Sequence, residues 1–357
     1  MTKLQRCIAL AIALTFLSCS PASKSGNYKI ALVPARTGQH GIFSINSDTT
    51  GGKLLTSDTS AQLRASSWSP DGKKIAFFAI RRNDSALLKK YNIPLHLPLY
   101  WMDAGGGNQT RLLDFPVSSF AWSPDSRQLL VVSAYEDPAR GDSEIQSGRK
   151  LPMSAVYLLN LQTGGQRRVT GFGQNCYGSW SPDGTRVALS FGNEQNAEIY
   201  SASIDGRHTR RLDDTPAKNI KPVWSPDGKK VAYISVSSPA EGGTAAAYVV
   251  NDDGTNRRCL EDENVQEVSW SPDGKHLLIQ TAGGLGLTGA DNNRSVKLTG
   301  GVIEPRDGVF TPDGNEVMFR SDHEGEWHLY AVDVKSLKVR RITGRLSASM
   351  FCLSPLD

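Results

Sequence analysis

A five-residue motif, Trp-Ser-Pro-Asp-Gly, recurs along this chain of 357 residues and constrains its fold more than any other feature. Proline presets the first turn position, aspartate can bond its own backbone, and glycine accepts a positive φ, so each copy predicts a tight turn. An aromatic residue before the turn and a short apolar run after it are typical of two paired strands. The copies place their aromatic and acidic residues at Trp68 and Asp71, Trp122 and Asp125, Trp180 and Asp183, Trp224 and Asp227, Trp270 and Asp273, and Phe310 and Asp313.

The spacing of the copies indicates the architecture. Successive motifs begin roughly 40 to 60 residues apart, and repeats of about this length built from short strands are typical of a β-propeller. A single four-stranded sheet, or blade, cannot bury both of its faces, whereas blades placed around an axis cover one another. We therefore expect an all-β protein in one domain.

The repeats resemble a known family. The motif followed by Lys-Lys-Ile-Ala-Phe at residues 73–77 is similar to the PD40, or TolB-like, β-propeller repeats, and the resemblance extends over nearly all of the chain after its first residues. It implies the fold more than the function, because the motif residues build the scaffold. TolB itself carries an additional α/β domain before its propeller, and we expect this chain to lack it.

The two ends of the chain predict how the ring closes. Lys29–Val33, Gly41–Ile45 and Lys53–Thr56 resemble the second, third and fourth strands of a blade that has no first strand. Ala348–Asp357 resembles a first strand that stops inside its turn. We therefore predict seven four-stranded blades over residues 28–357, the last one joining both chain ends and leaving no open edge. Six blades, as in TolB, is the alternative.

The first residues predict export. A short basic segment precedes the apolar run Cys7–Leu17, which is too short for a membrane span of about 20 residues. The residues around Cys19 resemble a bacterial lipobox, which implies a signal peptide at 1–18, lipidation of Cys19 and a linker at 19–27. Anchoring at the periplasmic face of the outer membrane would follow. The alternative is ordinary cleavage near Ala22, which releases the protein into the periplasm.

Charge and cysteine content restrict the partners. The formal net charge is +4, with acids and bases spread along the chain, whereas a nucleic-acid binder needs a strong basic excess on one face. Basic pairs in the outer strands, such as Arg210-Arg211, are expected to protect edge strands from pairing. Cys176, Cys259 and Cys352 lie in different repeats. We expect small buried apolar side chains there, although export would permit one disulfide.

Two repeats carry long insertions between their second and third strands, at Arg81–Pro98 and Tyr135–Met153. Strand direction alternates within a blade, so both insertions emerge on one face and the motif turns on the other. Long loops in a compact domain are often functional, and the first insertion combines basic charge with aromatic and apolar groups, as interfaces do. The alternative is that its apolar residues fold back over their own blade. The candidate partner-binding residues are Arg81, Arg82, Lys89, Lys90, Tyr91 and His96.

The sequence contains none of the catalytic motifs sought: no Gly-x-Ser-x-Gly elbow, no Walker loop and no haem attachment site. Turn chemistry explains the repeated aspartates. His40, His96 and His323 fall in loops on one face of neighbouring predicted blades, where three imidazoles could bind a transition metal. Oligogalacturonate lyases, propellers of similar repeat type, have such a site. We prefer scattered surface histidines and predict neither a metal nor another cofactor.

These observations predict a non-catalytic, lipid-anchored propeller that binds a protein or an envelope component, as TolB-like propellers commonly do. The alternative is a periplasmic enzyme or sugar-binding propeller, for example one with a lyase-like metal site on the insertion face.

Overall fold

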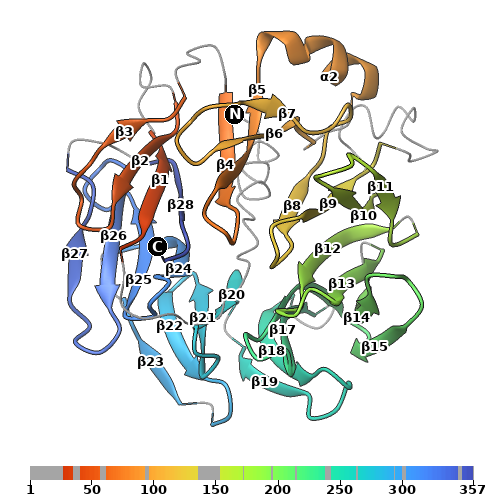
Figure 1. Cartoon of the computed structure of the whole chain (residues 1–357). Helices are drawn as coiled ribbons and strands as arrows, with labels where there is room; N and C mark the ends of the chain where they lie inside the picture. The colour runs from red at the N-terminus through yellow and green to blue at the C-terminus, as the bar shows by residue number, and fades with distance from the viewer. Residues whose placement is uncertain are drawn as a thin grey trace.

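The structure, a computed structural model, describes residues 27–34, 41–56, 62–92, 96–135, 153–171, 173–193, 196–213, 215–237, 243–262, 264–292, 294–299, 303–344 and 348–356. Over these residues the chain forms antiparallel sheets arranged around a central axis (Figure 1). Two short helices, η1 (Arg82–Asp84) and α2 (Ser85–Tyr91), interrupt this pattern.

Five of the sheets have four strands each. The first contains β28 (Met350–Leu353), β1 (Lys29–Val33), β2 (Phe43–Asn46) and β3 (Lys53–Leu54). The next two contain β4 (Gln62–Trp68), β5 (Lys74–Ile80), β6 (Leu99–Asp103) and β7 (Thr110–Arg111), and β8 (Ser119–Trp122), β9 (Gln128–Ser133), β10 (Ala155–Asn160) and β11 (Gln166–Arg168). The last two contain β20 (Glu267–Trp270), β21 (His276–Thr281), β22 (Gly284–Gly289) and β23 (Ser295–Lys297), and β24 (Arg306–Phe310), β25 (Glu316–Ser321), β26 (His328–Asp333) and β27 (Val339–Arg341).

The sixth sheet has eight strands. Its first half contains β12 (Gln174–Trp180), β13 (Arg186–Gly192), β14 (Ala197–Ser203) and β15 (Thr209–Asp213). Its second half contains β16 (Lys218–Trp224), β17 (Lys230–Val236), β18 (Ala245–Asn251) and β19 (Arg258–Glu261). A single parallel pair, between Ala197 of β14 and Lys218 of β16, joins the two halves.

The all-β propeller is confirmed, but the predicted blade count is wrong. Within the described residues five blades stand as separate four-stranded sheets, and the remaining strands form one continuous sheet, so neither seven nor six separate blades is present. The reason is local. The short connection from β15 to β16 places Ala217 beside β14, where its carbonyl accepts a hydrogen bond from the Ala197 N–H at 3.2 Å. Sequence repeats cannot reveal such an edge contact.

The predicted joining of the chain ends is confirmed. β28 pairs antiparallel with β1, with Ile30 opposite Leu353 and Val33 opposite Met350. The Lys29 N–H also donates to Ser354 Oγ at 2.7 Å. Figure 1 shows the red β1 directly beside the blue β28. The first sheet therefore has no strand edge left open at the junction of the termini.

The motif tryptophans connect neighbouring sheets. Each is nearly buried, and three indole N–H groups donate to a main-chain carbonyl in the innermost strand of the preceding four-strand unit. The donors and acceptors are Trp122 and Ser67 at 3.3 Å, Trp180 and Ala121 at 3.2 Å, and Trp270 and Val223 at 3.1 Å. The aromatic residue of the motif thus holds one unit against the next as well as ending its own strand.

The first insertion folds back onto the molecule. Leu87 and Tyr91 of α2 are buried in a cluster that includes Phe115 and Tyr157, so the helix covers the outer part of two adjacent blades. In Figure 1 α2 lies at the rim of the ring, beyond β5 and β7. Most of the second insertion, residues 136–152, lies outside the described residues. Among those that are described, no helix is long and apolar enough to cross a membrane.

Candidate functional site

The six motif aspartates are used inside their own turns. Ser69 Oγ donates to Asp71 Oδ1 at 2.6 Å, and the Lys73 N–H donates to the same oxygen at 3.1 Å. Burial opposes ionisation, but these hydrogen bonds hold the pKa of Asp71 below its usual value. The pKa is lowered in the same way at Asp183, Asp227, Asp273 and Asp313. The repeated carboxylates therefore build the turns.

Two of the candidate partner-binding residues are buried. Tyr91 is 8% exposed and meets the ring of Tyr135 edge-on, with 6.5 Å between centroids. His96 is 5% exposed, and its Nε2 accepts a hydrogen bond from the Ala134 N–H at 3.1 Å. Both side chains hold the first insertion against the adjacent blade. A partner can reach them only if the insertion moves.

The basic residues of the insertion divide into two groups. Arg81 lies over the ring of Tyr100, 4.3 Å from its centroid, beside the fully buried Asp84. Asp84 accepts hydrogen bonds from the Tyr100 hydroxyl at 2.7 Å and from Arg111 at 3.2 Å, so its charge is compensated. The remaining three, Arg82, Lys89 and Lys90, are exposed. Their use by a partner remains a prediction.

Two of the three candidate metal histidines, His96 and His323, lie in the described part of the chain. His40 lies outside the described residues, and the Nε2 of His96 accepts a main-chain hydrogen bond. His323 lies 3.2 Å from Ser321 Oγ through Nδ1 and 3.6 Å from Glu324 through Nε2. Within the described part of the chain, no group of three or more His, Cys, Asp or Glu side chains is placed to hold a metal ion.

Two of the cysteines, Cys259 and Cys352, have described side chains. Cys352 is a buried free thiol whose pKa burial raises to about 12. Cys259 is half-buried, and its Sγ lies 3.8 Å from the Glu261 carbonyl oxygen. Cys19 and the side chain of Cys176 lie outside the described part of the structure.

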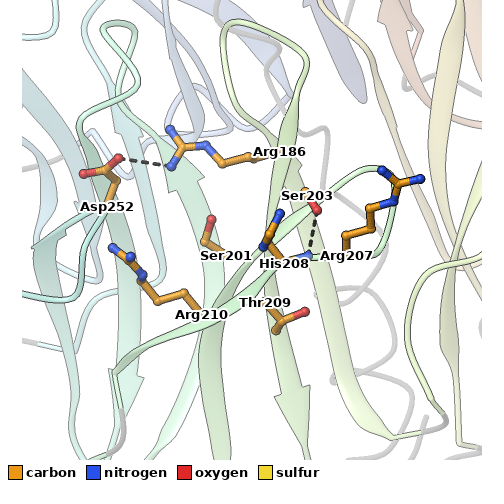
Figure 2. A pocket seen from close by; sticks show the side chains of 8 residues that line it. All are labelled: Arg186, Ser201, Ser203, Arg207, His208, Thr209, Arg210 and Asp252. Carbon is orange, nitrogen blue, oxygen red and sulfur yellow. Dashed lines mark hydrogen bonds and ion pairs between the residues drawn. The ribbon is translucent and has the colours of Figure 1, made fainter.

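A cleft opens on the face that carries the motif turns, at the joint between the two halves of the eight-stranded sheet. Its volume is about 450 Å³. Arg186 enters it from the start of β13, and β14 and β15 each supply two side chains (Figure 2). The turn between β14 and β15 and the turn after β18 supply the rest. Its charged and titratable lining residues are Arg186, Arg207, His208, Arg210 and Asp252.

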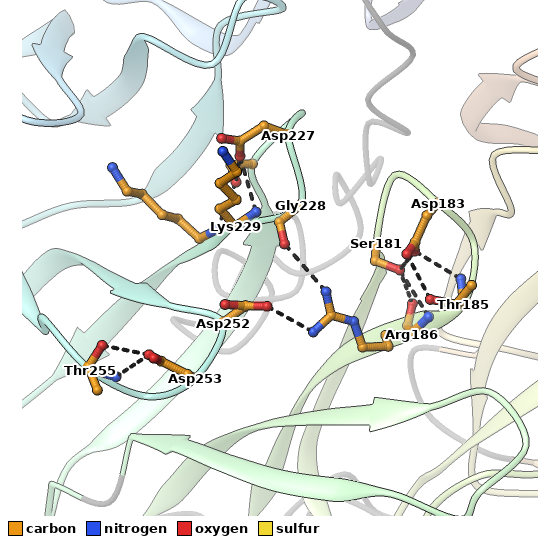
Figure 3. A network of polar contacts seen from close by, with 12 residues as sticks. Ser181, Asp183, Thr185, Arg186, Asp227, Gly228, Lys229, Asp252, Asp253 and Thr255 are labelled. Atoms are coloured by element: carbon orange, nitrogen blue, oxygen red, sulfur yellow. Dashed lines mark hydrogen bonds and ion pairs between the residues drawn. The ribbon is translucent and has the colours of Figure 1, made fainter.

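Arg186 ties the inner side of the cleft together. Its Nη1 lies 3.1 Å from Asp252 of the second half, and its Nη2 donates to the Gly228 carbonyl at 3.4 Å (Figure 3). The guanidinium also lies over the ring of Trp224, 4.6 Å from its centroid. The Asp252 carboxylate is thus already paired with Arg186.

The turn before β15 presents cations to solvent. Ser203 Oγ donates to Asp205 and accepts a hydrogen bond from the His208 N–H, so this hydroxyl is committed to the turn. The hydrogen bond from Ser203 is the largest cause of the lowered pKa of Asp205. The side chain of Arg207 is 81% exposed, 3.7 Å from Asp205.

Arg210 is the least engaged cation of the cleft. It donates no hydrogen bond within the described residues, and its charge only adds to the hydrogen bonds from Thr255 that lower the pKa of Asp253. The sequence interpretation assigned this arginine to edge protection. The sequence did contain a signal for this basic site. Residues 207–211 include a histidine and three arginines but no acidic residue.

Comparison with known proteins assigns the family. A family model described as "TolB beta propeller domain" matches residues 88–287. Among curated proteins, the chain is 24% identical over 395 aligned positions to dipeptidyl-peptidase 5 of Porphyromonas gingivalis, covering 95% of this chain. It is 29% identical over 182 residues to the uncharacterized peptidase YuxL of Bacillus subtilis, covering 50% of this chain.

Solved structures support the fold. An oligogalacturonate lyase from Vibrio parahaemolyticus superposes with a TM-score of 0.62 at 14% identity, covering 89% of this chain and all of the other. The curated relatives are longer, since the chain spans 55% of the dipeptidyl-peptidase and 27% of YuxL. Because the family model matches more than half of the chain, the chain belongs to the TolB β-propeller (PD40) family.

Proposed function

We propose that this protein is an exported, lipid-anchored propeller that binds another protein or an envelope component and catalyses no reaction. The anchor is Cys19, and the location is the periplasmic face of the outer membrane. The observation that carries the binding role is the open, electropositive cleft between the two halves of the eight-stranded sheet.

The chemistry of the cleft suits recognition. Arginine is enriched at protein interfaces, and its planar guanidinium donates two parallel hydrogen bonds to a carboxylate. Ser203, a hydroxyl in the lining, is held by Asp205 and by the His208 main chain, an arrangement that builds a turn. A rigid sheet presents the cations, which limits the conformational entropy lost on binding.

A second candidate surface is the exposed part of the first insertion, with Arg82, Lys89 and Lys90. It lies on the opposite face from the cleft, so one small partner cannot contact both. Charge-reversal variants can distinguish the two surfaces. Each surface has a pair of exposed basic residues that can be changed without disturbing buried hydrogen bonds.

The test compares three double variants in cells treated with a membrane-permeant crosslinker. R207E/R210E changes the cleft, K89E/K90E changes the insertion, and K335E/K338E is the matched control in an exposed turn of another blade. We expect the crosslinked envelope partner to fall roughly tenfold or more with the cleft pair alone, as for loss of charged contacts in an interface. Loss of the crosslinked partner in K89E/K90E alone would place the binding site on the first insertion instead of the cleft. A partner retained by all three variants, or the absence of one in wild type, contradicts the proposal.

The alternative function is a periplasmic enzyme or sugar-binding propeller, and the observation that favours it is the fold likeness to an oligogalacturonate lyase. Metal analysis of the purified protein tests its lyase-like form. Stoichiometric metal that is lost in H40A and H323A would support it.

A further inference from the structure

Basic side chains close several of the joints between neighbouring sheets on the motif-turn face. Each stands in an outermost strand and donates to a main-chain carbonyl in the next unit's outer turn. Lys53 Nζ donates to the Gly105 carbonyl at 2.9 Å, Arg167 donates to the Ile204 carbonyl, and Arg258 Nη1 donates to the Asp291 carbonyl at 2.8 Å.

These three residues occupy one structural position. Their partners in the adjacent third strands are Ser44 for Lys53, Leu158 for Arg167 and Val249 for Arg258. Those partners are equivalent. Leu158 and Val249 pair with residues that stand eight positions after the motif tryptophan. Ser44 pairs with Ala31, one residue after Ile30, which lies opposite Leu353 where the other sheets have the motif tryptophan. The position is therefore a clamp at these three joints. In β27 the equivalent residue, Arg340, donates to Glu316 of its own sheet instead.

Arg210 occupies the same position in the first half of the eight-stranded sheet, opposite Ser201. It does not close its joint: within the described residues it donates no hydrogen bond to the next turn. The other end of this joint, on the insertion face, is held by the pairing of Ala197 with Lys218. The joint is thus fastened at the insertion face and, on the motif-turn face, at its inner side by Arg186, which binds Asp252 and the Gly228 carbonyl. The outer part on the motif-turn face, where Arg210 stands, is the cleft (Figure 2).

We propose that the cleft binds the carboxylates of an acidic peptide segment, with Arg210 donating to a carboxylate in place of the turn carbonyls that its equivalents reach. This inference rests on the proposed function and names the chemistry of the partner. A carboxylate accepts two parallel hydrogen bonds from a guanidinium, and Arg207 and His208 can attract a neighbouring acid. A concave cleft of about 450 Å³ admits a side chain from an extended peptide, whereas a flat bilayer cannot enter it.

The binding test uses a blocked hexaglutamate peptide, a hexaglutamine peptide as control, and titration calorimetry at low and high salt. We expect the glutamate peptide alone to bind, and to bind more weakly at high salt because exposed charges are screened. R210A should weaken binding roughly tenfold, as expected for loss of a charged hydrogen bond. R258A is the matched control, since it removes the same side chain from an occupied clamp and should leave the affinity unchanged.

Thermal unfolding supplies an independent readout. R258A should lower Tm because it removes hydrogen bonds to the Ala290 and Asp291 carbonyls, whereas R210A should leave Tm unchanged without peptide. Equal losses of Tm in both variants, or peptide binding that survives R210A, would overturn the inference. So would binding of phosphatidylglycerol vesicles, lost in R210A, without binding of the peptide. If the glutamate peptide fails to bind but R207E/R210E still loses the crosslinked partner, the acidic-peptide assignment is wrong and the proposed binding function stands.

Discussion

Ser126 stands where five other motif copies have glycine, and it shows how one substitution is accommodated in a repeated turn. Its φ is +61°, a left-handed conformation that costs a residue with a side chain roughly 1 kcal/mol. In return its Oγ accepts a hydrogen bond from the Asp71 N–H in the turn of the preceding blade, at 3.0 Å. Strain within one turn is therefore offset by a contact between two turns.

Two variants of Ser126 distinguish the cost of the backbone strain from the contribution of the hydrogen bond. S126A keeps the strain and loses the hydrogen bond, so the free energy of unfolding should fall by about 1 kcal/mol. S126G loses the hydrogen bond but relieves the strain, so its stability should stay within about 0.5 kcal/mol of wild type. Urea unfolding of both measures the difference. S126A as stable as wild type would show that the hydrogen bond contributes nothing, and equal stability of the two variants would show that the left-handed φ carries no strain.

The outer strands and α2 protect the edges of the molecule in different ways. β11, β15 and β27 expose basic side chains, which discourage pairing with another chain, as expected for edge strands. α2 instead covers apolar side chains of two blades with Leu87 and Tyr91. The first insertion therefore has a structural role besides any partner that its exposed lysines bind.

Truncation tests the contribution of β28. Removing residues 350–357 takes away the strand that pairs with β1, exposes Leu32, and removes Pro355, which lies against Gly72. Since units stabilise their neighbours, we expect Tm to fall by roughly 10 °C or more, or the protein to become insoluble. Removing residues 356–357 alone is the control and should change Tm far less. A long truncation that melts like wild type would show that the paired ends are dispensable.

At the scale of the whole molecule, the ring has two unlike faces. The insertion face carries α2 and the paired start of β14, whereas the motif-turn face carries the cleft. A lipid anchor before the first strand would hold the domain beside a membrane while leaving a face open to a partner. With this arrangement the anchor would be separable from binding, so we expect that each can be removed without the other.

Cys19→Ala tests the anchor. Without the thiol no lipid can be attached, so the mature protein should move from the membrane fraction to the soluble periplasmic fraction. Folding should be unaffected, because residue 19 precedes the first strand of the ring. Fractionation followed by immunoblotting measures the shift, with an alanine variant of Ser20 as control. Wild-type protein that is already soluble after export would contradict the lipid anchor and favour ordinary cleavage.

The sequence by itself determined the class of fold, the turns and the way the termini meet. These follow from local chemistry, because a Pro-Asp-Gly turn needs only its own residues. The N-terminal segment has three strands of a blade and the C-terminal segment has the missing first strand, so the two segments predict one complete blade. The bounds of β1 were predicted to the residue, and β28 lies within the predicted C-terminal segment. The aspartate turns follow from the same chemistry, as the hydrogen bond from Ser69 to Asp71 shows.

Only the tertiary structure decided how the sheets join and where a cleft opens. Whether Ala197 meets Lys218, or whether Arg210 reaches the next turn as Arg258 does, depends on the spacing of neighbouring units, which no repeat encodes. Burial likewise decided that Tyr91 and His96 pack inward while Lys89 and Lys90 remain exposed. Arg210 and Arg258 look alike in the sequence. They differ because Arg258 donates to the Ala290 and Asp291 carbonyls, whereas Arg210 lies near Asp253 and donates no hydrogen bond within the described residues.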